Sequence, residues 1–113
     1  MHEFSLIQNL LQQCEYHAEQ AGSHKVLAIH VSIGMMAGVE PELFKRAYDT
    51  FRQQTVCSDA ELEIHWQPLE LFCLQCASLT SLHEPRYSCQ QCGSTSVRVE
   101  KGEDILLMRL EME

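Results

Sequence analysis

Positive charge is scarce in this chain of 113 residues. Eight lysines and arginines stand against 16 aspartates and glutamates, which gives a formal net charge of −8 when histidine is neutral. Proteins that bind nucleic acid use clusters of cations to displace counterions from the phosphates. The acidic balance therefore argues against a nucleic-acid partner, and it favours a metal cation or a basic protein as the partner.

Long hydrophobic runs and targeting signals are also missing. No stretch approaches the roughly 20 apolar residues that a membrane-spanning helix needs. The opening residues lack a basic segment, and polar side chains interrupt the apolar ones too often for a signal peptide. Cys14 and Cys57 have no evident disulfide partner in the sequence, which fits reducing conditions. We therefore expect a cytoplasmic protein that does not bind membranes.

The sequence shows no motif of an enzyme active site. It has no glycine-rich loop that would cradle a phosphate and no recognisable pair of nucleophile and base. We therefore expect a protein that is not an enzyme and that depends on a partner for any nucleotide-driven step.

Four cysteines carry the strongest chemical signal that is present. They form two CxxC pairs, Cys73–Cys76 and Cys89–Cys92, with twelve residues between them. Each pair can present two thiolates from one tight turn, and four thiolates suit a closed tetrahedral Zn²⁺ site. Two disulfides or a redox-active CxxC are the alternatives, but a redox motif normally stands alone at a strand–helix junction. We predict a structural zinc ribbon with a hairpin over residues 77–88.

Hydrophobic periodicity predicts two helices and three strands outside this ribbon. Apolar residues recur every three or four positions over residues 3–21, and Gly22 ends that stretch. A second helix should begin at Glu40-Pro41 and run to about residue 54. Alternation of apolar and polar residues predicts strands over residues 25–33, 61–67 and 105–112.

The order of these elements predicts an α+β fold. Two helices can cover only one face of a sheet, so we expect both on one face of a three-stranded mixed sheet. The four-cysteine zinc ribbon should form a lobe inserted before the last strand, and residues 105–112 are apolar enough to form the central strand. We expect one α/β domain of residues 1–68 and 96–113 and a zinc-binding domain of residues 69–95.

The first three residues, Met1, His2 and Glu3, form a potential chelator. The α-amine, the His2 amide nitrogen and the His2 imidazole can occupy three adjacent corners of a plane through two small chelate rings. This planar set of nitrogens favours Ni(II) or Cu(II) over Zn(II), which prefers a tetrahedron. The fourth donor stays open between Glu3 and Glu40, and a solvated terminus without metal is the alternative.

The opening Met-His-Glu-Phe-Ser-Leu, the Ile33-Gly34 strand end and the spacing of the two CxxC pairs together resemble the HypA/HybF family of nickel-insertion proteins. The resemblance covers nearly the whole chain, and the one departure is Gln90, where many members have proline. It implies nickel bound by Met1, His2 and Glu3, so that residues 1–68 and 96–113 form a nickel-binding α/β domain. It also implies zinc bound by the ribbon cysteines Cys73, Cys76, Cys89 and Cys92.

The resemblance also implies a task and partners. It implies a metallochaperone that delivers nickel to the precursor of the [NiFe]-hydrogenase large subunit together with the GTPase HypB, and urease accessory proteins as further partners in some bacteria. A zinc-ribbon adaptor for protein interaction or transcription is the rival interpretation. The sequence leaves open the main client, the nickel affinity and the choice between a monomer and a weak homodimer.

The remaining histidines and cysteines fit structural roles better than metal sites. His30 and His65 should lie on the outward face of their strands, where a metal-binding pair would need a favourable register. His83 lies inside the ribbon, where we expect a spectator and keep a sensing role as the alternative. Cys14 falls on the apolar stripe of the first helix, and Cys57 is expected near the surface without a partner.

Overall fold

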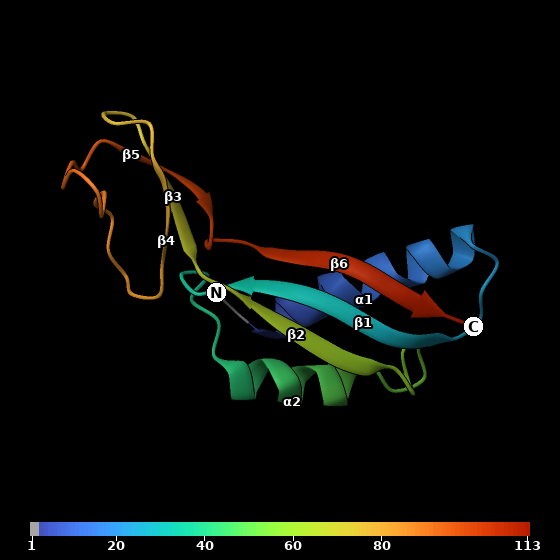
Figure 1. The fold of residues 1–113 in the computed structure, drawn as a ribbon. Coiled ribbons are helices and arrows are strands. Elements are labelled where there is room, and N and C mark those ends of the chain that lie inside the picture. The colour runs from blue at the N-terminus through green and yellow to red at the C-terminus, as the bar shows by residue number, and fades with distance from the viewer. Residues whose placement is uncertain (1–2) are drawn as a thin grey trace. The chain divides into compact units, whose positions relative to one another are not determined.

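In the part of the chain that the structure describes, the strands form two sheets of three strands each, ordered β2-β1-β6 and β4-β3-β5. The computed structural model describes residues 3–113 (Figure 1). Two compact units result, one of residues up to 31, 39–64 and 107–113, and one of residues 32–38 and 65–106. The elements are α1 (Glu3–Gln20), β1 (Val26–Gly34), α2 (Pro41–Phe51), β2 (Glu61–Gln67), β3 (Leu69–Cys73), β4 (Leu79–Leu82), β5 (Val97–Lys101) and β6 (Ile105–Met112).

The sheet β2-β1-β6 is mixed, as the sequence predicts. In Figure 1, β1 and β2 run in the same direction and β6 runs in the opposite one. The Glu113 N–H, just after β6, donates to the Lys25 carbonyl, just before β1, at 3.0 Å. The prediction that residues 105–112 form the central strand is wrong, because β1 is central and β6 is an edge. Leu106 and Met108 are 59% and 56% exposed, so the apolar run in β6 does not mean burial on both faces.

Both helices cover one face of this sheet and bury its apolar side. Ile7 of α1, Phe44 of α2 and Ile29 of β1 expose no surface. Glu40 caps the start of α2 with its carboxylate, and Pro41 occupies the first turn, where a helix needs no backbone N–H. Neither helix within residues 3–113 is long and apolar enough to cross a membrane.

The second helix is shorter than the sequence predicts. α2 ends at Phe51, and Gln54 adopts a φ of 62°, a left-handed conformation that cannot continue an α-helix. The Tyr48 hydroxyl and the Arg52 guanidinium both donate to the Ala60 carbonyl, at 2.6 Å and 2.8 Å. These hydrogen bonds fix the irregular segment of residues 52–60 between α2 and β2.

The second sheet is built around the first CxxC pair. β3 pairs antiparallel with β4, with Leu69 opposite Leu82; Cys73 ends β3, and Cys76 lies in the turn that joins the two strands. The hairpin predicted over residues 77–88 is therefore wrong, because these residues supply only one strand of it. The cause is burial: Leu69 and Leu82 belong to a buried apolar cluster with Leu71, whereas the residues that follow Leu82 are mostly polar.

Two glycines allow backbone segments of the second unit to touch. A Cβ atom on Gly34 would lie 2.3 Å from the carbonyl carbon of Gly102, and a Cβ atom on Gly102 would lie 2.7 Å from the Cα atom of Leu69. Gly102 also has a φ of +111°, which side chains rarely permit. Close approach of the backbone therefore requires glycine at both positions.

Candidate metal centres

Four cysteine sulfurs converge in the second unit. The Sγ–Sγ distance is 3.6 Å from Cys73 to Cys92 and 3.7 Å from Cys76 to Cys89, and all four sulfurs lie within 4.8 Å of one another. A tetrahedron with Zn–S bonds of about 2.3 Å has edges of about 3.8 Å, so this spacing fits a four-thiolate zinc site. Within residues 3–113 it is the one group of three or more potential ligands, and the exposed His83 lies outside it.

Two turns of the same kind position these sulfurs. In each CxxC pair the sulfur of the first cysteine accepts hydrogen bonds from the backbone N–H groups two and three residues further along the chain. The residue after each pair has a positive φ. Ala77 and Gly93 occupy that position, with φ values of 60° and 77°. The donors are Gln75 and Cys76 to Cys73, both at 3.4 Å, and Gln91 and Cys92 to Cys89, at 3.3 Å and 3.4 Å.

Hydrogen bonds favour a thiolate at two of these cysteines but not at all four. The hydrogen bond with the Ser78 hydroxyl lowers the pKa of Cys76. The Ser78 hydroxyl, followed by the backbone N–H of Cys92, lowers the pKa of Cys89 to about 6. The pKa of Cys92 is raised to about 12: the Ser94 N–H lowers it, but the hydrogen bond with Cys73 and burial outweigh that effect. Four thiolates therefore require a cation among them, and the charge of a bound Zn²⁺ meets that requirement.

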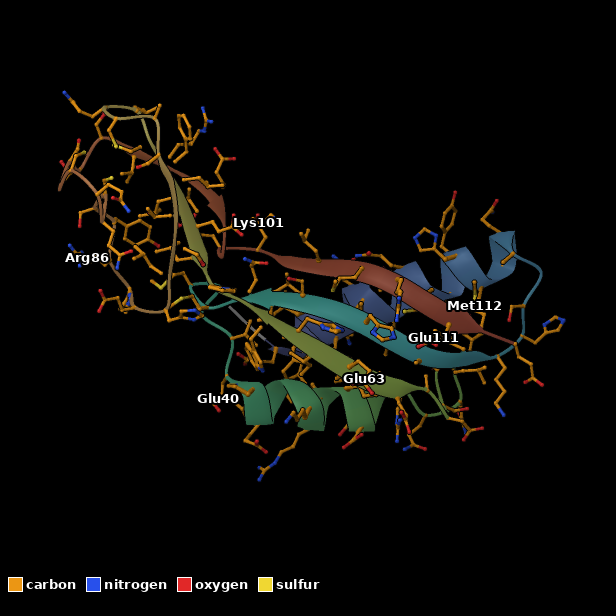
Figure 2. The ribbon with its side chains drawn as sticks, viewed as in Figure 1. Glu40, Glu63, Arg86, Lys101, Glu111 and Met112 are labelled. Carbon is orange, nitrogen blue, oxygen red and sulfur yellow. The ribbon has the colours of Figure 1, made fainter. Side chains whose placement is uncertain are left out.

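Two of the three residues predicted to bind nickel, Met1 and His2, lie outside the described residues. The third, Glu3, begins α1, and its carboxylate accepts the backbone N–H of Glu40 at 3.2 Å. Glu40, the other candidate for a fourth donor, also accepts the N–H of Glu42 at 3.4 Å where α2 begins (Figure 2). The Glu3 side chain and the Glu40 backbone therefore meet where the two helices start.

His30 has a protein partner that the sequence did not reveal. It is only 8% exposed, and its Nε2 atom lies 2.6 Å from a carboxylate oxygen of Glu111 on the neighbouring strand β6 (Figure 2). This hydrogen bond with His30 lowers the pKa of Glu111. The contact depends on the pairing of β1 with β6, which periodicity along the chain cannot show. Neither His30 nor His65 belongs to a group of three or more potential ligands in the part of the chain described.

The prediction that Cys57 lies near the surface without a partner is wrong. Cys57 and Cys14 are both fully buried, and their side chains share a hydrogen bond. The Val56 N–H donates to a carboxylate oxygen of Glu15 at 3.1 Å, which holds the segment after α2 against α1. Cys14 is a core residue, as its position on the apolar stripe predicts.

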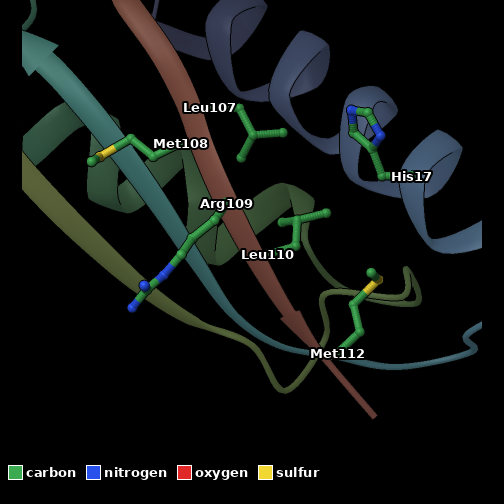
Figure 3. Close-up of a pocket in the computed structure, with 6 residues that line it drawn as sticks. All are labelled: His17, Leu107, Met108, Arg109, Leu110 and Met112. Atoms are coloured by element: carbon green, nitrogen blue, oxygen red, sulfur yellow. The ribbon is translucent and has the colours of Figure 1, made fainter. Parts of the chain in front are cut away.

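A groove of about 310 Å³ runs beside β6 (Figure 3). Most of its side chains are apolar, and an imidazole and a guanidinium are its ionisable groups. The lining includes neither a cysteine nor a carboxylate, so these residues do not form a metal site like the one above. The residues are His17 of α1 and Leu107, Met108, Arg109, Leu110 and Met112 of β6.

Comparison with known proteins identifies relatives along the whole chain. A family described as "Hydrogenase/urease nickel incorporation, metallochaperone, hypA" matches residues 1–112. The hydrogenase maturation factor HypA of Shewanella sp. (strain MR-7) is 43% identical over 113 residues, which cover 100% of this chain and 96% of the relative. The protein of the same name from Campylobacter jejuni subsp. jejuni is 39% identical, with 100% of both chains covered.

Solved structures agree with this result. The solution structure of the Ni metallochaperone HypA from Helicobacter pylori has a TM-score of 0.77 and 34% sequence identity, and the match covers 99% of this chain and 97% of that one. A further solution structure of a HypA protein has a TM-score of 0.78 and 35% identity. With the fold, the four-cysteine centre and full-length relatives in agreement, this chain belongs to the HypA family of hydrogenase and urease nickel-incorporation metallochaperones.

Proposed function

We propose that this protein binds Ni(II) through Met1 and His2 with Glu3, and delivers the ion to the precursor of the [NiFe]-hydrogenase large subunit. Family membership over residues 1–112 is the observation that carries the proposal. The α-amine, the amide nitrogen and the imidazole supply three planar donors, a set that suits Ni(II). The contact between Glu3 and Glu40 supports a fourth donor from one of these carboxylates.

In the same proposal the four ribbon cysteines hold Zn²⁺ as a structural ion. The sulfur spacing of 3.6 Å and 3.7 Å supports this assignment. Four thiolates leave no open position for a substrate, so the ion stabilises the fold and does not catalyse a reaction. The protein accordingly acts as a carrier and not as an enzyme.

The two metals belong to separate parts of the chain in this proposal. Residues 1–68 and 96–113 form the nickel-binding domain, and residues 69–95 form the zinc-binding domain. Glu3 and the cysteines lie in different compact units, which supports such a division. The GTPase HypB supplies the nucleotide-driven step in the cytoplasm, and urease accessory proteins are a further set of partners.

A complementation experiment tests this function. In a bacterium that lacks its own HypA, the parent chain should restore nickel to the hydrogenase large subunit, and the His2→Ala variant should leave that subunit without nickel. His24→Ala changes an exposed histidine in the turn after α1 and should restore nickel as the parent does. A zinc-ribbon adaptor predicts instead that His2→Ala restores the nickel content fully, and that result would overturn the proposal.

A further inference from the structure

Two cysteines outside the metal centre form a pair inside the first unit. Cys14 lies on the buried face of α1, and Cys57 lies in the irregular segment that follows α2. Neither side chain exposes any surface, and a hydrogen bond joins them. Both are free thiols in this structure, so the first unit holds a dithiol that the nickel and zinc sites do not use.

Several contacts keep the two thiols together. Glu15, next to Cys14, accepts the N–H of Val56, next to Cys57, at 3.1 Å. The Thr55 hydroxyl accepts the N–H of Cys57 at 3.1 Å. One hydrogen bond holds the segment that carries Cys57 against α1, and the other stabilises the turn within that segment. The backbone around both cysteines therefore keeps the two thiols together.

The pair is also chemically asymmetric. The hydrogen bond from Cys14 lowers the pKa of Cys57, and the same bond raises the pKa of Cys14. The positive charge of Arg52 lowers the pKa of Cys57 further, against the opposing effects of burial and Glu15. In a thiolate beside a protonated thiol, the thiolate sulfur can attack an oxidant. The second sulfur can then attack the oxidised one and form a disulfide.

We propose that Cys14 and Cys57 form a redox-sensitive dithiol that a peroxide converts into a disulfide between α1 and the segment after α2. The Cys57 sulfur attacks one peroxide oxygen, which forms an S–O bond, breaks the O–O bond and releases hydroxide that takes a proton to become water. The Cys14 sulfur then attacks the Cys57 sulfur. An S–S bond forms, the S–O bond breaks, and the departing hydroxide leaves as water with the Cys14 proton.

The segment around Cys57 offers a route for the peroxide. Residues 52–60 form neither helix nor strand, and Gln54 holds a strained φ of 62°. Segments of this kind open more easily than the helices and strands beside them. Local opening gives a small oxidant access to the thiols without unfolding of the unit. The disulfide then ties the segment to α1 and opposes later opening.

Mass spectrometry of the zinc-loaded protein tests this proposal. The protein is treated with increasing hydrogen peroxide, the remaining thiols are blocked by alkylation, and the protein is digested without reduction. The first product should be a peptide pair that joins Cys14 to Cys57, about 2 Da lighter than the two free peptides and separable by a thiol reductant. Zinc content should be unchanged at that dose, and the midpoint of thermal unfolding should rise.

Two single variants serve as controls. Cys14→Ala and Cys57→Ala should each lose the linked peptide and the rise in the unfolding midpoint after peroxide treatment. The parent protein gives the decisive result by itself, so a poorly folded variant does not leave the question open. If peroxide oxidises the ribbon cysteines and releases zinc while Cys14 and Cys57 remain alkylatable thiols, the proposal is overturned.

Discussion

Single residues of this protein act mainly through backbone contacts and hydrogen bonds. Backbone N–H groups point at Cys73 and Cys89, and the residues that end the two turns, Ala77 and Gly93, take up left-handed conformations. Gly102 lets a loop pass within van der Waals contact of Leu69. Each of these details sets the position of a neighbouring element, so individual substitutions have specific expected effects.

Substitution of Gly102 should destabilise the second unit strongly. Gly102→Ala combines an unfavourable φ of +111° with a Cβ atom 2.7 Å from the Leu69 Cα atom. Backbone strain and overpacking together should lower the free energy of unfolding by about 3–5 kcal/mol. The fluorescence of Trp66, the single tryptophan, reports urea unfolding of this unit.

Gly38→Ala is the matched control, because Gly38 also has a positive φ, of +72°, but a Cβ atom there meets nothing within 4 Å. It should cost about 1–2 kcal/mol from backbone strain alone. Equal losses for the two variants would show that close approach at Gly102 is not what requires glycine.

The contact between His30 and Glu111 should be visible in a titration. NMR should give Glu111 a pKa below the ordinary value of about 4.3, because the hydrogen bond with His30 favours the carboxylate. His30→Gln should raise that pKa, and Arg109→Gln should raise it less, since Arg109 acts only through charge.

The lowered pKa of Glu111 determines how the stability of the folded protein changes with pH. A depressed folded-state pKa contributes stability that is present above about pH 4.3 and is lost as the pH falls through the folded-state value. The contact would be disproved by a Glu111 carboxyl that titrates at its ordinary value and does not respond to His30→Gln.

At the level of helices and strands, the sequence predicted what depends on local periodicity. The stripe of α1, the proline at the start of α2 and the alternation in β2 each matched an element of the structure. Periodicity cannot show which strands become neighbours. The edge position of β6 and the burial of Cys57 beside Cys14 arise from contacts between segments that are distant in the sequence. The pairing of β3 with β4 is local, but burial of Leu69 and Leu82 decides it.

The four-cysteine centre could be predicted because the spacing of CxxC pairs is local chemistry. A zinc ion bound there, as proposed, should supply much of the folding energy of the second unit. Apparent zinc affinities of about 10–16 kcal/mol, divided among four ligands, give about 3 kcal/mol per thiolate, so Cys76→Ala should weaken zinc binding on the order of 100-fold. Amide hydrogens of β3 and β4 should then exchange faster, while those of α1 and α2 keep their protection.

Leu74→Ala is the control for this variant, because Leu74 lies in the same turn, is 59% exposed and offers no ligand. It should leave zinc content and amide protection unchanged. An unchanged zinc affinity in Cys76→Ala would refute the four-thiolate assignment and would point to a different ligand, such as His83.

The whole molecule combines an acidic surface, a four-cysteine centre in one compact unit and candidate nickel ligands in the other. An excess of negative charge attracts metal cations and basic partners to the molecule. The proposed nickel site adds a dependence on pH. The α-amine has an ordinary pKa of about 7.7–8.0 and histidine one of about 6.5, so protons compete with nickel at both donors below neutral pH.

The central claim is that nickel binds at the first residues of the chain, and nickel titration by calorimetry at neutral pH tests it most directly. The parent with a free Met1 amine should bind one nickel ion tightly, and so should His24→Ala. A chain with one extra residue before Met1, and the His2→Ala variant, should lose tight binding while zinc content stays the same. Equal nickel affinity in the parent, the extended chain and His2→Ala would contradict the account.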